Sequence, residues 1–311
     1  MRLSLAFDTG LQRPETCVVL HPHDDFDIAG LTADVVHPFR PTHDAWASRG
    51  MTVTPDRPGG RWDMAVVVAA RSKAQTKDLI AWAAAHADVV VVDGQKTDGI
   101  DSYYKGIRKL TDVAGTITKG HGRLFWFEAI DLADWADTPA DVDGFQTRAG
   151  VFSADGIDPA SAMLAAHLPD VMKGSVLDLG AGWGFLSKHV LDREITSVDL
   201  VEADHVALEC AKVNITDERA KFYWANAIKH KGKYDWVIMN PPFHKGREGD
   251  PGLGQAFIQT AAKCLAPGGK LLMVANAHLP YEATMEACFI KVETTKPDRR
   301  FKIFQASRPK R

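Results

Sequence analysis

The chain has 311 residues, of which 45% are hydrophobic, so it can bury a sizeable core, and at roughly 150 residues per domain its length predicts two domains. The formal net charge of -3 excludes a protein that binds nucleic acid through overall basicity. Any contact with RNA must therefore come from a local group of basic residues.

The cysteines and the N-terminus point to a cellular compartment. Cys17, Cys210, Cys264 and Cys288 form no CxxC pair, so the sequence predicts neither a zinc site nor disulfides. The first residues contain no apolar segment of signal-peptide length, and no run reaches the roughly 18 apolar residues of a membrane span. We expect a soluble, cytoplasmic protein without a bound metal ion and without membrane contact.

Two strongly apolar runs in the first half, residues 64–70 and 89–93, predict buried strands. Between them, residues 74–86 place apolar side chains at helical spacing, which completes a βαβ unit. A further helix is predicted over residues 103–110 and a further strand over residues 123–127. This pattern is typical of a small doubly wound α/β domain.

The first domain lacks the usual signal for a bound nucleotide. The turn after residue 93 reads Gly-Gln-Lys-Thr-Asp-Gly, which has no GxGxG spacing to bring backbone amides against a cofactor. Residues 131–143 are rich in Asp, Ala and Pro, as a linker is. We therefore predict a cofactor-free, Rossmann-like domain over residues 1–145, which binds substrate or stabilises the fold, and a second domain over residues 146–311.

The second domain alternates predicted strands and helices, which implies a second Rossmann-like doubly wound fold with a mostly parallel sheet. Its strands are predicted over residues 175–179, 195–202, 221–224, 234–239, 270–275 and 301–306. Its helices are predicted over residues 160–167, 185–191, 205–213, 253–265 and 281–288.

A glycine-rich turn joins the strand 175–179 to the next helix. Gly180, Gly182 and Gly184 let the chain turn tightly and bring its backbone against a ligand at the carboxyl end of the strand. Such a turn alone is weak evidence, because dinucleotide-dependent oxidoreductases use a similar one. Asp178 favours a ligand that contains an amino acid, because its carboxylate can pair with an ammonium group and would repel a pyrophosphate.

Two more polar residues stand at the ends of the following strands. Glu202 lies twenty residues after Gly182, where a carboxylate can accept hydrogen bonds from both hydroxyls of a ribose, and Asp199 and Asp204 are close competitors. Asn226 follows the strand 221–224 and is the candidate for contact with an adenine edge. Asn is also common in turns for conformational reasons alone, so this second interpretation of Asn226 stays open.

The strand predicted over residues 234–239 runs into Asn240, Pro241, Pro242 and Phe243. The two prolines fix the backbone and remove two N–H donors, which leaves carbonyl oxygens and the Asn amide oxygen as acceptors for a planar amine. Phe243 offers a face on which a base can stack. An Asn-Pro pair can be a plain turn, but a turn does not explain its occurrence after a GxGxG turn. We therefore predict that this segment holds an amine substrate.

Together these motifs carry a resemblance. Residues 151–309 resemble the C-terminal domain of the bacterial 16S ribosomal RNA guanine-N2 methyltransferases of the RsmC type, and the first half is more faintly similar to that family's cofactor-free N-terminal domain. The Asn-Pro-Pro-Phe segment alone also occurs in adenine-N6 and glutamine-N5 methyltransferases. The matching segments are residues 73–76, 99–102, 150–158, 176–187, 240–246, 274–281 and 300–303.

The resemblance implies a class I methyltransferase fold, S-adenosylmethionine as the cofactor, and the N2 amine of a guanine in ribosomal RNA or the small ribosomal subunit as the substrate. Three alternatives stay open: a methyltransferase of adenine N6 or glutamine N5, a non-catalytic RNA-binding assembly factor, and a dehydrogenase. By the resemblance, catalysis falls to Asn240, Pro241, Pro242 and Phe243, and cofactor binding to Asp178, Gly180, Gly182, Gly184, Glu202 and Asn226.

Overall fold

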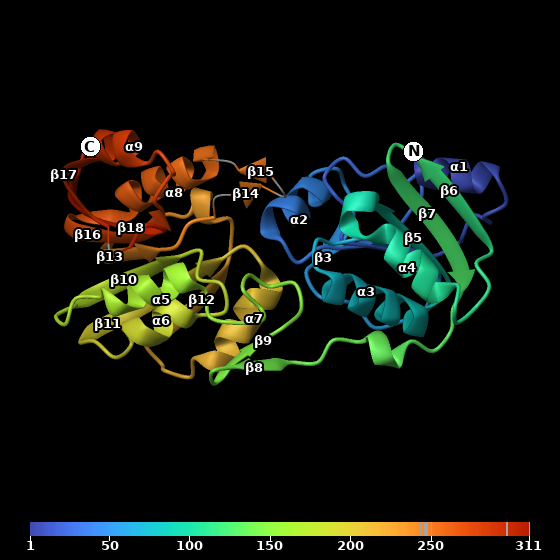
Figure 1. The fold of residues 1–311 in the computed structure, drawn as a ribbon, viewed down its shortest axis with the longest axis horizontal. Helices are drawn as coiled ribbons and strands as arrows, with labels where there is room; N and C mark the ends of the chain where they lie inside the picture. The colour runs from blue at the N-terminus through green and yellow to red at the C-terminus, as the bar shows by residue number, and fades with distance from the viewer. Residues whose placement is uncertain (243, 246–247, 250, 297, 311) are drawn as a thin grey trace. The chain divides into compact units, whose positions relative to one another are not determined.

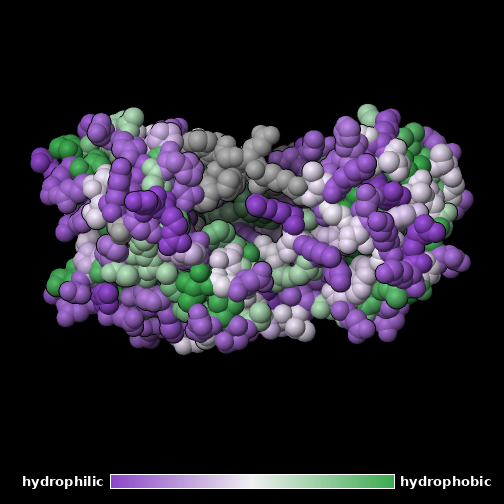
Figure 2. Space-filling model, viewed as in Figure 1, coloured by the Kyte–Doolittle hydropathy of each residue, from purple (hydrophilic) through white to green (hydrophobic). Residues whose placement is uncertain are grey.

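The chain forms two compact units, Met1–Pro139 and Ala140–Arg311, in a computed structural model (Figure 1). Figure 2 shows that the viewed surface of each unit is mostly hydrophilic. No helix within the described ranges combines the length and the apolar character that a membrane-spanning helix requires. The structure describes residues 1–242, 244–245, 248–249, 251–296 and 298–310.

The first unit is built on one seven-stranded sheet in the described part of the chain. Its strands are β1 (Cys17–Leu20), β2 (Asp34–Val36), β3 (Thr52–Thr54), β4 (Trp62–Val68), β5 (Ala87–Gln95), β6 (Gly115–Lys119) and β7 (Gly122–Glu128). Its helices are α1 (Arg2–Asp8), α2 (Arg40–Ala47), α3 (Lys73–His86) and α4 (Ile100–Ile107), with the short 3-10 helices η1 (Lys96–Asp98) and η2 (Ala133–Trp135).

The strand order of this sheet is β3-β2-β1-β4-β5-β7-β6. The first five strands are parallel, and β7 runs antiparallel to both of its neighbours. Strands β4 and β5 are nearly continuous apolar runs because buried cores lie on both faces of the sheet. Helix α4 begins three residues before its predicted start, because Gly99, in the left-handed conformation at φ 79°, allows the chain to turn directly into it.

The second unit contains a larger set of elements. Its strands are β8 (Ala140–Val142), β9 (Phe145–Thr147), β10 (Gly174–Leu179), β11 (Ile195–Glu202), β12 (Ala220–Trp224), β13 (Tyr234–Met239), β14 (His244–Lys245), β15 (Glu248–Gly249), β16 (Leu265–Asn276), β17 (Phe289–Thr295) and β18 (Phe301–Pro309). Its helices are α5 (Pro159–Ala166), α6 (Phe185–Val190), α7 (His205–Asn214), α8 (Pro251–Cys264), α9 (Glu282–Cys288) and the 3-10 helix η3 (Ala227–Lys229).

The main sheet of the second unit has the order β12-β11-β10-β13-β16-β18-β17. Five strands are again parallel, and β18 is antiparallel to both neighbours. The two units therefore repeat one strand order with one set of directions. The predicted fold class, two Rossmann-like doubly wound α/β domains with mostly parallel sheets, is confirmed.

Strand β10 lies at the point where the strand order reverses. The chain first adds β11 and β12 on one side of β10 and then returns to place β13 on the other side. Asp178 in β10 is in register with Leu200 of β11 and Ile238 of β13, so the carboxyl ends of these strands meet at one edge. Open α/β sheets bind their ligands in the crevice at this reversal.

The two faces of β10 are buried in different cores. Val176 packs in the core that contains residues of α6 and α7, whereas Leu177 and Leu179 pack in the core that contains residues of α8. Because side chains alternate along a strand, Asp178 shares the face of Val176 and lies beneath α6. This places a carboxylate in an otherwise apolar layer, directly before the glycine-rich turn.

Candidate active site

The glycine-rich turn is fixed by hydrogen bonds from its backbone amides to the end of β11. The amide of Gly180 donates to the Val201 carbonyl at 2.9 Å, and the amide of Gly182 donates to Oε2 of Glu202 at 2.8 Å. Gly184 has φ 90° and immediately precedes α6; a Cβ there would lie 2.8 Å from Cδ1 of Ile215. A Cβ on Gly182 would meet nothing within 4 Å, so this glycine leaves open space beside the turn.

Asp178 is fully buried, and one of its two carboxylate oxygens has a partner. Oδ2 accepts a hydrogen bond from Oγ of Ser187 in α6 at 2.7 Å. Oδ1 is buried without a hydrogen-bond partner among the described residues. Burial, together with a smaller effect of the nearby Glu202 carboxylate, raises the pKa of Asp178 to about 7. An unpartnered buried carboxylate oxygen is costly, which indicates a site built for a cationic or hydrogen-bond-donating group.

Glu202 closes β11 with both of its oxygens in use. Oε2 accepts from Gly182, and Oε1 accepts from the amides of Ala203 at 2.7 Å and Asp204 at 2.8 Å. Burial raises the pKa of Glu202, while these backbone hydrogen bonds lower it. A carboxylate has about four lone-pair positions, so the side chain retains capacity for hydroxyl donors. Its contact with a ribose stays a prediction.

The two competitors of Glu202 have different surroundings. Asp199 accepts a hydrogen bond from the hydroxyl of Tyr234 at 2.8 Å. Asp204 caps α7, where Oδ1 accepts from the amide of Val206 at 3.0 Å, and burial together with the charge of Glu202 raises its pKa to about 7. Asp204 therefore adds a second carboxylate close to Glu202 at the end of β11.

Asn226 lies at the end of β12, on the far side of β11 from the glycine-rich turn. Its Oδ1 accepts a hydrogen bond from the amide of Ile228 at 3.2 Å, so the side chain caps η3. This contact is the turn chemistry that the sequence also allowed. The contact of Asn226 with adenine stays a prediction.

Asn240 follows β13, and its amide nitrogen is bound by two side chains from the start of α5. Nδ2 donates to Oδ2 of Asp158 and to Oγ of Ser161, both at 2.9 Å. The same Oδ2 of Asp158 accepts from the amide of Ser161 at 2.8 Å and so caps α5. An ionised carboxylate can only accept, so the nitrogen end of the Asn240 amide must face Asp158. The acceptor Oδ1 is thereby left for another donor.

The next residues of the segment are Pro241, Pro242 and Phe243. Pro241 is buried and Pro242 is exposed. Phe243 lies outside the described residues. Asn240 shares a small cavity of about 40 Å³ with Asp158, Ser161 and the turn residues 180–183. The structure thus brings the glycine-rich turn and Asn240 to one cavity.

A loop before α5 forms another wall of this cavity. The carbonyl of Phe152 accepts a hydrogen bond from Nε1 of Trp183 at 2.8 Å, while the Phe152 side chain is 60% exposed. The Trp183 ring is buried against Phe145 and Phe185, with ring centroids 5.1 and 5.8 Å away. This packing attaches the loop to the glycine-rich turn and leaves an aromatic side chain at the edge of the cavity.

Sequence reasoning missed Asp158, Ser161 and Phe152. The order Asp158-Pro159 is a recognisable helix start, because Asp is a favoured cap and Pro a favoured first residue. That signal identifies a helix end and not a contact with Asn240, which lies 82 residues further along the chain. No local pattern carries this information.

The residues at the switch point fit S-adenosylmethionine. This cofactor carries a positive ammonium and a positive sulfonium, which suit the unpartnered oxygen of Asp178 and the carboxylates of Glu202 and Asp204. The pyrophosphate of NAD would meet the same negative groups. Within the described ranges, no group of three His, Cys, Asp or Glu side chains could hold a metal ion. Fold and site together define a class I, S-adenosylmethionine-dependent methyltransferase.

Comparison with known proteins gives the family. The model of the methyltransferase small domain matches residues 144–305. Several relatives are described as ribosomal RNA small subunit methyltransferase C. The Yersinia enterocolitica protein is 32% identical over 244 residues, which cover 75% of this chain and 70% of that protein. The Psychromonas ingrahamii protein is 30% identical over 263 residues, which cover 78% of this chain and 75% of that protein. A Serratia proteamaculans relative is 34% identical over 201 residues, and the alignment spans 60% of this chain and 55% of that protein.

A solved structure has the same fold over nearly the whole chain. It is the T. thermophilus 16S rRNA N2 methyltransferase RsmC in complex with AdoMet and guanosine, at a TM-score of 0.80 and 23% identity, and the alignment covers 98% of this chain and 91% of that one. The chain belongs to the methyltransferase small domain family and, within it, to the ribosomal RNA small subunit methyltransferase C proteins.

Proposed function

We propose that this protein transfers a methyl group from S-adenosylmethionine to the exocyclic N2 amine of a guanine in the RNA of the small ribosomal subunit. The observation that carries the proposal is the Asn240 amide, whose nitrogen end is held by Asp158 and Ser161 so that its oxygen is left as an acceptor beside the glycine-rich turn. The names of the family's curated members and the guanosine bound to the T. thermophilus structure support the choice of substrate.

Asn240 and its neighbours orient the amine. Oδ1 of Asn240 and the carbonyl of Pro241 accept the two N–H bonds of the exocyclic amine, and Phe243 stacks on the ring. Asp158 and Ser161 are positioning residues, because they hold the nitrogen end of the Asn240 amide and so determine which end faces the substrate. Pro242 keeps the segment rigid and adds no competing N–H donor.

The chemistry follows from this placement. The lone pair of a guanine amine is delocalised into the ring, and two acceptors that favour a tetrahedral nitrogen return that pair to the nitrogen. Fixed orientation supplies much of the remaining rate enhancement. S-adenosylmethionine, when bound, supplies an electrophilic methyl group on a positive sulfur. The amine proton becomes strongly acidic once nitrogen has a fourth bond and can leave to water, so the chain need not provide a base.

Cofactor binding falls to the residues at the ends of β10, β11 and β12. Asp178 pairs with the ammonium, Gly180, Gly182 and Gly184 allow close approach of the backbone, and Glu202 binds the ribose hydroxyls. Asn226 binds the adenine edge through its amide nitrogen, while its oxygen keeps the η3 cap. The three buried carboxylates with raised pKa values, Asp178, Glu202 and Asp204, support this arrangement, because ionisable groups with perturbed pKa values cluster at functional sites.

The first unit binds no cofactor in this proposal and serves the RNA. The turn after β1 is the topological counterpart of the turn after β10, and its first residue makes the equivalent hydrogen bond: the amide of His21 donates to the Val36 carbonyl at 2.9 Å, as Gly180 donates to Val201. His21 has φ 55° but carries a side chain, and its ring lies 5.4 Å from that of His37. Side chains therefore stand where a cofactor would need bare backbone.

Methyl incorporation tests the proposal. Purified protein is given labelled S-adenosylmethionine and small ribosomal subunits, or their RNA, from a strain that lacks the gene, and the digested nucleosides are identified. We expect N2-methylguanosine, with a loss of about 10²- to 10³-fold in rate for Asn240→Ala and little change in cofactor affinity. Labelled N6-methyladenosine or labelled protein would establish another amine as the substrate. Near-native turnover by Asn240→Ala would overturn the mechanism.

The proposed substrate places the protein in the cytoplasm, where ribosomal subunits are assembled.

A further inference from the structure

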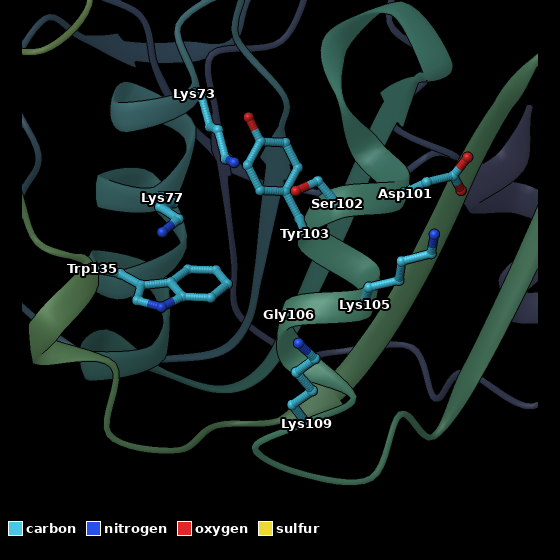
Figure 3. A pocket seen from close by; sticks show the side chains of 9 residues that line it. All are labelled: Lys73, Lys77, Asp101, Ser102, Tyr103, Lys105, Gly106, Lys109 and Trp135. Carbon is cyan, nitrogen blue, oxygen red and sulfur yellow. The ribbon is translucent and has the colours of Figure 1, made fainter.

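The first unit contains a cavity that the mechanism does not use. It has a volume of about 490 Å³ and lies between α3 and α4, with Trp135 of η2 on its border (Figure 3). Its lining includes the lysines Lys73, Lys77, Lys105 and Lys109. Figure 3 shows the ammonium groups of Lys73 and Lys77 and the indole of Trp135 around the open centre of the cavity.

The cavity is strongly positive. Asp101, the one carboxylate among its lining residues, is already engaged, because Nε of Arg123 donates to its Oδ1 at 2.8 Å. Asp78 on α3, adjacent to Lys77, is paired with Arg57. Within the described part of the chain, the four lysines form no salt bridge of their own. Ammonium groups without counterions attract an anion, and a concave wall strengthens their field.

Trp135 adds an aromatic surface to the cationic one. Its ring is half-buried, and Nζ of Lys77 lies 5.0 Å from the ring centre. A Cβ on Gly106 of α4 would lie 3.2 Å from the indole, so glycine at this position gives the ring its room. A tryptophan seated in this way, in a cavity with exposed lysines on two helices, offers a stacking surface next to phosphate-binding groups.

We propose that this cavity binds a single-stranded segment of the RNA substrate, with phosphates on the lysines and a base on Trp135. Stacking on an aromatic ring beside a basic track is how proteins hold unpaired nucleotides without reading their sequence. An acidic peptide would satisfy the lysines but would leave the ring unused. The inference rests on the proposed function and identifies the part of the first unit that contacts the RNA.

The lysines are tested by salt dependence. Binding of a fluorescent single-stranded RNA to the full-length protein is measured by anisotropy over a range of KCl concentrations. Each phosphate contact contributes about 0.7 to the slope of log affinity against log salt, so Lys73→Ala with Lys109→Ala should reduce that slope by about 1.4 and weaken binding about tenfold at low salt. Lys96→Ala with Lys119→Ala removes the same charge from exposed positions outside the cavity and should change the slope far less.

Trp135 is tested separately. Trp135→Ala should weaken RNA binding about 5- to 100-fold with an unchanged salt slope, and Trp135→Phe should restore most of the affinity. Thermal melting of each variant, with and without S-adenosylmethionine, shows whether it remains folded. Polyglutamate that competes as well as RNA of equal charge would overturn the assignment to nucleic acid.

The outcomes separate this inference from the proposed function. If the unmodified protein methylates guanine but the cavity variants bind RNA like the control pair, RNA binding by the cavity is refuted and the proposed methyl transfer is unaffected. Unmodified protein that binds no ribosomal RNA and methylates no guanine would refute the function on which the inference rests.

Discussion

Asp158 provides the sharpest test of how the site is oriented. Its Oδ2 accepts both the amide of Ser161, which caps α5, and Nδ2 of Asn240. Asp158→Ala would remove both contacts, so its effect would combine a loss of helix stability with a loss of the Asn240 orientation. Asp158→Ser is more selective, because serine is a good helix cap but is too short to replace the carboxylate at Asn240.

The size of the effect follows from the bond that is lost. A hydrogen bond to a charged group contributes about 1.5–3 kcal/mol, which corresponds to about 10- to 100-fold in the population of the correct Asn240 orientation. The upper limit is the loss of the acceptor itself, about 10²- to 10³-fold. We therefore expect kcat of Asp158→Ser to fall about 10- to 100-fold, with little change in the KM for S-adenosylmethionine. Asp158→Asn retains an acceptor oxygen and the cap and should recover much of the activity.

A double-mutant cycle distinguishes positioning from general damage. Methyl transfer to ribosomal RNA is measured for Asp158→Ser, Asn240→Ala and the double variant, and thermal unfolding is followed for each. If Asp158 acts through Asn240, its replacement adds nothing once Asn240 is alanine. An unchanged kcat for Asp158→Ser, or an equal further loss in the Asn240→Ala background, would refute the reasoning.

Three further effects are expected. Burial raises the pKa of Asp178 to about 7, so this carboxylate loses negative charge as the pH falls from 8 to 6. Calorimetry should therefore show S-adenosylmethionine binding more weakly at the lower pH. Asp178→Asn should weaken binding and reduce its dependence on pH. Because the folded-state pKa of Asp178 lies above its unfolded value, the unliganded protein should lose stability in thermal melts as the pH rises from about 4 to 7, and Asp178→Asn should lose less. Gly184→Ala should cost about 1–3 kcal/mol in denaturant unfolding, because φ is 90° and the new Cβ would press on Ile215; a cost below 0.5 kcal/mol would contradict the strain.

The elements with strong apolar runs were predictable from the sequence. The strands β11 and β13 begin and end at the predicted residues, because each is an apolar run between clear breaks. The strands β1, β2 and β3 were missed, since segments of three or four residues are too short to show a period. Strand β17 was missed because most of its side chains are exposed, which is the pattern of an edge strand and not of a buried one.

The candidate site was predictable only where its residues stand at strand ends. Gly180 and Asn240 each stand directly after a strand, and strand ends in a parallel sheet meet at one edge. The partners of these residues come from distant segments. Ser187 binds Asp178 across nine residues, and Asp158 binds Asn240 across 82, so only tertiary structure could reveal them.

The repeated sheet bears on our proposal that only the second unit binds the cofactor. Both units have the same strand order and directions, and both make the same amide-to-carbonyl hydrogen bond after the first strand, from His21 or from Gly180. Strand order and this hydrogen bond therefore do not distinguish the two units. The difference lies in the side chains: the first turn begins with His21, whereas the counterpart turn begins with Gly180 and follows the unpartnered oxygen of Asp178. On our proposal, cofactor chemistry depends on a few side chains at one strand end and not on the fold that carries them.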